Sequence, residues 1–223
     1  MDSPAKINLS NREQLIVMDK DFIMAKQHII SIVYKMFSML ATKLQSNITR
    51  SSFQLPLELV HAIPKIYKGE NYRHLPYVII DYPSVFTKEG IITLRTMFWW
   101  GNFFSATLHL NGLYKEKYGD LLIEKIKNTP GNLYYCINEN EWEHHFKKNN
   151  YELLYKISAG DLKDLNARKS FIKTAVYFPL TDWKNMLYNL ESVGWELIKL
   201  LSINFPLGEK DLSPDIPKAD FDL

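Results

Sequence analysis

The residues with the clearest chemical potential lie within residues 90–112. The first half of this stretch carries Arg95 and the second half carries His109. Arginine presents a fixed cationic fork that suits carboxylate and phosphate groups, and histidine exchanges protons near neutral pH. Two such side chains on one face of a hairpin can bind a small anion. The sequence therefore makes this stretch the first candidate for a site.

The two halves are predicted to pair as a β-hairpin, because β-rich runs flank Gly101-Asn102, a pair that favours a turn. A loop of those two residues alone, with Trp100 opposite Phe103, mixes apolar and charged side chains on both faces. A three-residue loop over 101–103, with Trp100 opposite Phe104, separates them, and burial should select that register.

The three-residue register gives one apolar face and one polar face. It places Arg95 opposite His109 and Trp99 opposite Ser105 on the polar face. We expect the ligand to lie on this face. The candidate ligand-binding residues come from the hairpin and from the end of the preceding strand: Arg95, His109, Trp99, Thr107, Asp81 and Tyr82. The competing interpretation is a sheet face in contact with water, which antiparallel sheets commonly have.

Catalytic arrangements are weaker candidates. Ser105 and His109 lie four residues apart on one strand, about 13 Å at the usual rise, so they form no Ser-His-Asp triad with Asp81. A hydrolase-type enzyme that uses His109 with an acidic partner stays an alternative, and the sequence does not decide whether the protein is an enzyme. Glycine-rich phosphate loops are absent, so no cofactor is expected.

A metal site is also considered in the stretch Glu141-Trp142-Glu143-His144-His145. If residues 138–150 form a short helix, Glu141 and His145 lie on one face of it. Zinc needs a third and usually a fourth ligand, and neither HExxH nor HxxEH is present. We therefore predict no metal, and an exposed charged helix instead.

The aromatic tip of the hairpin offers a function of another class. Trp100, Phe103 and Phe104 are the candidate interface residues, since aromatic side chains are favoured at the centres of interfaces. They would dock into a partner or pair across a homodimer axis. The alternative is that the first and last helices cover them.

The remaining elements follow from periodicity and from Pro and Gly positions. The predicted helices cover 11–45 (one helix, or two joined near 26–28), part of 55–66, 114–127, 138–150, 160–167 and 181–202, with Gly194 marking a close contact. The predicted strands cover 76–82, ended by Pro83, and 133–137, 151–157 and 170–178, while 69–75 is predicted to be a loop. Neighbouring strands with short turns indicate an α+β fold: an antiparallel sheet built on the central hairpin, with the long N-terminal helix and the C-terminal helix mainly on one face.

Composition sets the outer limits. Hydrophobic residues make up 46% of the 223 and charged residues 23%, with a formal net charge of +2, which gives no case for nucleic acid. One cysteine, Cys136, allows no internal disulfide, and no run is long and apolar enough to span a membrane. We expect a cytoplasmic protein without a membrane partner, with one domain over 1–205 and a Pro-rich, acidic tail over 206–223.

Residues 69–112, including LPYVIIDYPSVF and TLRTMFWWGNFFSATLHLNG, resemble a family of uncharacterised bacterial proteins with no assigned activity. The resemblance implies a small bacterial α+β protein and carries no functional residues over to this chain.

Overall fold

The computed structural model describes residues 8–127 and 131–202, so the predicted tail over 206–223 lies outside the described residues. In chain order the elements are α1 (Asn11–Met18), α2 (Lys20–Arg50), α3 (Leu57–Val60), β1 (Lys65–Tyr72), β2 (Leu75–Phe86), β3 (Gly90–Trp99), β4 (Phe103–Gly112), α4 (Leu113–Ile126), β5 (Tyr134–Cys136), β6 (Tyr151–Leu153), the 3-10 helix η1 (Leu154–Lys156), α5 (Ala159–Arg168), β7 (Phe171–Pro179), η2 (Leu180–Asn185) and α6 (Met186–Lys199).

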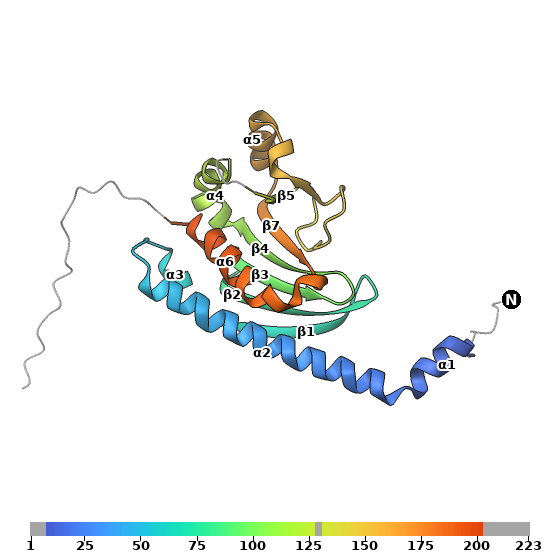
Figure 1. The fold of residues 1–223 in the computed structure, drawn as a ribbon. Coiled ribbons are helices and arrows are strands. Elements are labelled where there is room, and N and C mark those ends of the chain that lie inside the picture. Colours follow the sequence, from blue (N-terminus) through green and yellow to red (C-terminus); the bar gives the residue numbers. More distant parts are fainter. Residues whose placement is uncertain (1–7, 128–130, 203–223) are drawn as a thin grey trace, which may run out of the picture.

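The strands form one seven-stranded sheet in the order β1-β2-β3-β4-β7-β5-β6, and neighbouring strands run antiparallel. The helices α2 and α6 lie across one face of it (Figure 1). The predicted α+β class, with the N-terminal and C-terminal helices on one face of an antiparallel sheet, is confirmed.

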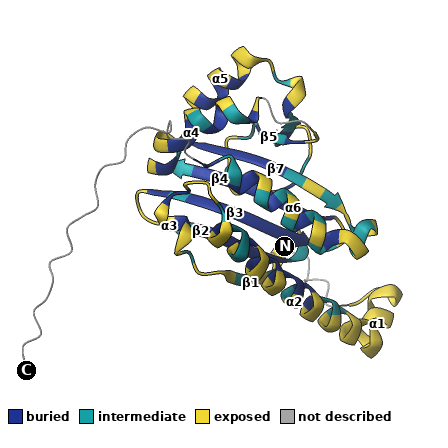
Figure 2. Ribbon diagram, turned by 60° about the vertical axis from the view of Figure 1, so that its left-hand side comes forward, coloured by how far each residue is buried: buried dark blue, intermediate teal, exposed yellow. Residues whose placement is uncertain are grey.

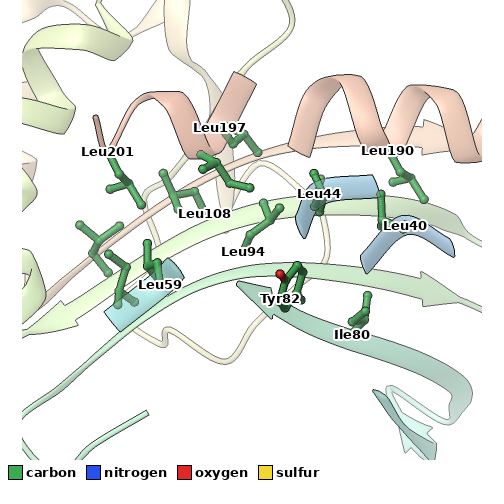
Figure 3. Close-up of a cluster of buried hydrophobic side chains, with 14 of the residues drawn as sticks. Leu40, Leu44, Leu59, Ile80, Tyr82, Leu94, Leu108, Leu190, Leu197 and Leu201 are labelled. Carbon is green, nitrogen blue, oxygen red and sulfur yellow. The ribbon is translucent and has the colours of Figure 1, made fainter. Parts of the chain in front are cut away.

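The layer between these helices and the sheet is the main core. Leucines from both helices and from the inward face of the strands meet there (Figure 3). A Cβ on Gly194 would lie 3.1 Å from Leu94 Cδ2 and 3.6 Å from Leu44 Cδ2. The close contact predicted at Gly194 is therefore confirmed, and it lets α6 approach both the sheet and α2.

The hairpin register differs from the predicted one by two residues. Phe98 pairs with Phe104 and Trp99 with Phe103, so the loop is Trp100-Gly101-Asn102. Gly101 has a φ of 70° and the Asn102 N–H donates to the Trp99 carbonyl at 3.0 Å. Glycine therefore occupies the left-handed third position of a turn that starts at Trp99, which fixes where pairing begins.

A two-residue shift changes partners but not faces, because side chains alternate with a period of two. Arg95 pairs with Thr107 rather than with His109, whose partner is Thr93. Trp99 pairs with Phe103 rather than with Ser105. The two predicted faces are otherwise as expected: the apolar residues face the helices and Arg95 and His109 share the opposite face.

Several predicted boundaries are wrong. The first helix breaks at Asp19, not near residues 26–28, because the extended Asp19 ends α1 and its side chain caps α2. β2 continues through Pro83 by a bulge between Asp81 and Ser84. Residues 65–72, predicted in part as loop, form strand β1, and residues 138–150 contain no helix. The last helix begins as the 3-10 helix η2 before α6.

Candidate functional site

The sheet face opposite the helices is buried rather than open to water. Arg95 is 7% exposed, His109 3% and Lys173 1%. The cover is a segment without helix or strand, residues 137–150, which we call the covering segment. We call the polar side chains beneath it the polar sheet face. It comprises the partly buried Tyr67 and the buried Asp81, Arg95, Thr107, His109 and Lys173.

An ion pair on neighbouring strands occupies the middle of the polar sheet face. Arg95 donates from Nε to Asp81 Oδ1 at 2.8 Å and from Nη2 to Oδ2 at 2.9 Å. Tyr67 links to both: its hydroxyl accepts from Arg95 Nη2 and donates to Asp81 Oδ2, each at 2.8 Å. Burial opposes the charge on Arg95, but the hydrogen bonds and charge of Asp81 outweigh it and raise its pKa.

His109 faces an acid that the covering segment supplies. His109 Nε2 lies 2.9 Å from Glu141 Oε2, and Asn111 Nδ2 donates to the same oxygen at 2.6 Å. Burial lowers the pKa of His109 in spite of that hydrogen bond, so the imidazole is neutral near pH 7. The hydrogen bond from His109 in turn lowers the pKa of Glu141. The pair fastens the covering segment to β4.

Two lysines of β7 and its approach hold the main chain of the covering segment. Lys173 Nζ donates to the carbonyls of Glu141 and Glu143, both at 2.7 Å. Lys169 Nζ donates to the carbonyl of Asn138 in the segment, and also to the carbonyl of Cys136 at the end of β5, at 2.9 Å. Burial lowers the pKa of Lys173 to about 8, since its partners are neutral carbonyls. These contacts satisfy carbonyls that no regular element satisfies.

Tyr72, at the end of β1, fastens the other end of the segment. Its hydroxyl accepts from the His144 and His145 amides, at 2.7 and 3.1 Å, and donates to Glu143 Oε2 at 3.0 Å. Arg73 donates to the same carboxylate oxygen at 3.1 Å. Arg73 and His74 both have positive φ and form the two-residue turn between β1 and β2.

Between this fastening and the ion pair lies a pocket of about 300 Å³. We call it the aromatic pocket; its lining is one guanidinium, four aromatic rings, one imidazole and two aliphatic side chains: Arg95, Tyr67, Tyr72, Tyr77, Trp142, His144, Ile79 and Met97. The Trp142 ring centre lies 5.5 Å from the Arg95 guanidinium carbon. Burial lowers the pKa of His144 well below its ordinary value, so this wall is neutral at pH 7.

The six predicted ligand-binding residues are distributed unevenly around this pocket. Arg95 lines it, and Asp81 holds the guanidinium from behind. Trp99, Thr107 and His109 share the sheet face but are not among the lining residues. Tyr82 does not lie with the others, because adjacent strand residues alternate: its side chain faces Leu40, Leu44 and the rest of the helical core (Figure 3).

The predicted interface residues at the hairpin tip are mostly covered by the chain itself. Phe104 is fully buried and packs against Phe37 and Trp183, while Phe103 packs against Phe146. Trp100 alone is partly exposed. Docking through this tip stays a prediction, and it now depends mainly on Trp100.

The site residues that the sequence did not single out come from β1, β7 and the covering segment. Tyr67 and Tyr72 lie in a stretch predicted partly as loop, where Gly69 interrupts the apolar pattern. Lys173 could have been recognised from the sequence, because it is a single charged residue in the middle of a predicted strand with alternating side chains. Trp142 lies beside Glu141, and both were assigned to an exposed helix. Among the described residues, no group of three or more His, Cys, Asp or Glu side chains is placed to hold a metal ion.

Comparison with protein-family models, with curated proteins and with solved structures finds no match for this chain. The bacterial origin implied by residues 69–112 therefore stays a prediction. Within the part of the chain that the structure describes, no helix has the length and apolar character needed to cross a membrane.

Proposed function

We propose that the protein binds a small anionic ligand with a flat ring in the aromatic pocket. The observation that carries the proposal is the position of Arg95, whose guanidinium reaches the floor of a pocket walled by Tyr67, Tyr72, Tyr77 and Trp142. Pockets that bind small molecules combine apolar and aromatic walls with a few fixed polar groups. Here those polar groups are the guanidinium and the His144 ring.

The contacts of Arg95 indicate which end of a ligand it receives. Nε and Nη2 are engaged by Asp81 and Tyr67, and Nη1 has no hydrogen-bond partner among the residues at 8–127 and 131–202. A carboxylate oxygen forms a charge-assisted hydrogen bond with an arginine nitrogen, and such a bond is stronger than one to a neutral acceptor. Because Asp81 already balances the charge of Arg95, the gain from an anion over a neutral acceptor is expected to be moderate.

The size and walls of the pocket restrict the rest of the ligand. A volume of about 300 Å³ lies at the lower end of the range for ligand pockets, roughly 300–1,000 Å³. One aromatic ring bearing one carboxylate fits this space, and the surrounding rings favour edge-to-face contacts with it. The proposed ligand class is therefore a monocyclic aromatic carboxylate.

The surroundings of His109 favour ligand binding without catalysis. His109, the residue of the hydrolase alternative, is 3% exposed and hydrogen-bonded to Glu141 beneath the covering segment. Trp142 packs edge-on against it at 5.7 Å between ring centres. A substrate would have to displace both residues to reach the imidazole. A cytoplasmic location stays a prediction from the single cysteine and from the lack of a run long and apolar enough to span a membrane.

The test compares benzoate with benzamide, which share a ring and differ in charge. Titration followed by chemical-shift changes should show benzoate binding more tightly, by about tenfold for one charge-assisted hydrogen bond. Benzamide binding equally well would refute an anionic ligand, and absence of binding by both would refute the aromatic carboxylate class.

Two variants locate the binding. Trp142→Ala removes a wall residue that is 45% exposed, so the fold should survive while benzoate binding weakens about tenfold. Tyr188→Ala removes an aromatic ring that is 72% exposed on α6 and should leave binding unchanged. Equal effects of the two variants would place the ligand elsewhere and overturn the proposal.

A further inference from the structure

One wall of the aromatic pocket carries an imidazole that the protein leaves unengaged. This imidazole belongs to His144, which is partly buried and whose ring centre lies 5.5 Å from that of Tyr72. The two other histidines of this region are engaged: His109 Nε2 lies 2.9 Å from a carboxylate oxygen, and His145 Nδ1 accepts from the Lys147 amide at 3.2 Å. Among the described residues, the ring nitrogens of His144 have no hydrogen-bond partner.

Arg95 and His144 lie at different points along the floor of the pocket. This floor is β3, which is buried along almost its whole length (Figure 2), and Arg95 and Met97 of this strand both line the pocket. His144 lies beside Tyr72, whose ring packs against Trp99 at 5.0 Å between ring centres. Four residues separate Arg95 from Trp99, which is about 13 Å along a strand. A ring whose carboxylate is at Arg95 therefore directs its opposite carbon towards His144.

The protonation state of His144 indicates which group it can bind. Burial lowers the pKa of this imidazole well below its ordinary value, and the charges of Lys173 and Arg95 act in the same direction. A neutral imidazole has one N–H donor and one acceptor nitrogen. A hydroxyl group also donates one hydrogen bond and accepts others, so either tautomer of His144 can pair with it.

Other polar groups suit this end of the pocket less well. An ammonium group would be repelled by Arg95 and Lys173, whose charges act on His144. A second carboxylate would stay largely unsatisfied, because a neutral imidazole offers it a single N–H. The hydroxyl of Tyr77 lies over Gly69 in the edge strand β1 and not over the floor strand β3.

We infer that the ligand of the aromatic pocket carries a hydroxyl group on its ring, opposite the carboxylate, and that His144 binds this hydroxyl. Because this takes the carboxylate at Arg95 as its premise, it rests on the proposed function. The ligand class is thereby narrowed to monocyclic aromatic carboxylates with a para hydroxyl. The guanidinium and the imidazole hold the two ends of one ring, and the aromatic walls contact the ring between them.

The first experiment compares benzoate, 4-hydroxybenzoate and 2-hydroxybenzoate on the full wild-type chain by chemical-shift titration. The para isomer should bind about fivefold more tightly than benzoate, the gain expected from one hydrogen bond between neutral groups. The ortho isomer has the same atoms and charge, but its hydroxyl lies beside the carboxylate at Arg95. It should bind no more tightly than benzoate, and equal affinity for the two isomers would overturn the inference.

The second experiment assigns the hydroxyl to His144. His144→Phe keeps a flat ring and the main-chain amide that donates to Tyr72, but it removes both ring nitrogens. The ratio of the dissociation constants of benzoate and 4-hydroxybenzoate should fall from about five to about one. His28→Phe, at an exposed histidine of α2, is the matched control and should keep the wild-type ratio.

The outcomes separate this inference from the proposed function. If the wild-type ratio is near one, if His144→Phe keeps the wild-type ratio, or if His28→Phe lowers it equally, the role of His144 is refuted while benzoate binding stands. If the wild-type chain binds none of the three ligands, both the hydroxyl and the aromatic carboxylate are refuted.

Discussion

The ion pair of Asp81 and Arg95 should contribute more coupling energy to the stability of the fold than an exposed ion pair does. Both are buried and doubly hydrogen-bonded. Breaking a buried pair from one side costs about 3–5 kcal/mol, because the remaining charge is unpaired. We expect Arg95→Met to lower the free energy of unfolding by that amount, measured by urea denaturation. The double variant Arg95→Met with Asp81→Asn should lose less than Arg95→Met alone.

The matched control for this cycle is the exposed pair of Lys26 and Glu70, whose atoms lie 2.8 Å apart. Lys26→Met with Glu70→Gln should change the free energy of unfolding by less than about 1 kcal/mol and show little coupling. Additive effects at Asp81 and Arg95 would mean that the two side chains are independently solvated, contrary to the burial described above.

For single residues, the sequence predicts the sheet face on which a side chain lies but not the residue opposite it on the neighbouring strand. The alternation of side chains correctly placed Arg95 and His109 on one face. The predicted register was wrong by two residues, and a shift by an even number leaves every side chain on its face. The partner of Arg95 is Asp81, fixed by the β2–β3 pairing. The register of the two strands changes at the bulge after Asp81, and alternation within a single strand gives no sign of a bulge.

At the scale of the elements, the close approach of α6 to the sheet depends on Gly194. Gly194 faces Leu94 and Leu44 so closely that a larger side chain has no room. Gly194→Leu should therefore force α6 away from the sheet and destabilise the fold by about 1–3 kcal/mol. Thermal unfolding followed by circular dichroism measures the loss.

Gly160, in α5, is the control for this substitution, since a Cβ there meets only Ser158 Oγ, at 3.8 Å. Gly160→Leu should leave the fold as stable as the wild type or slightly more so, because glycine is a poor helix former. If the two leucine variants unfold alike, the helix–sheet contact at Gly194 is not limiting.

Elements with a regular period were predictable, and those held by distant partners were not. The helix predicted over 114–127 and the strand predicted over 170–178 match α4 and β7 to within one residue at each end. The covering segment has no period of its own: buried lysines, Tyr72 and His109 hold it from other elements. Because these distant partners cannot be seen in the sequence of the segment itself, its charged residues led to the prediction of an exposed helix. The turn of β1 uses Arg73-His74, a pair without the usual Asn or Gly.

At the scale of the whole molecule, buried titratable groups predict how stability varies with pH. Burial lowers the pKa values of His109, His144 and His145 from 6.5, so the unfolded chain binds protons first and stability falls as pH drops below that value. Above 10 the sign reverses, because burial raises the pKa of Tyr67 and the unfolded phenol ionises first.

Between pH 6.5 and pH 10, Lys173 should make the largest contribution to the change of stability with pH. Its pKa falls from 10.5 to about 8, chiefly through burial, and the charges of Arg95 and Lys169 lower it further while Cys136 and Glu141 oppose the shift. In this window the unfolded chain binds the additional proton, so stability should rise from about pH 8 to about pH 10 by roughly 2–3 kcal/mol. Urea denaturation across that range measures the rise.

Lys173→Met should flatten the rise, leaving the smaller contribution of Lys169, whereas Lys148→Met, at an exposed residue, should keep it in full. A wild-type profile without the rise, or one that Lys173→Met leaves intact, would mean that this ammonium reaches water in the folded chain and does not hold the covering segment by its carbonyls.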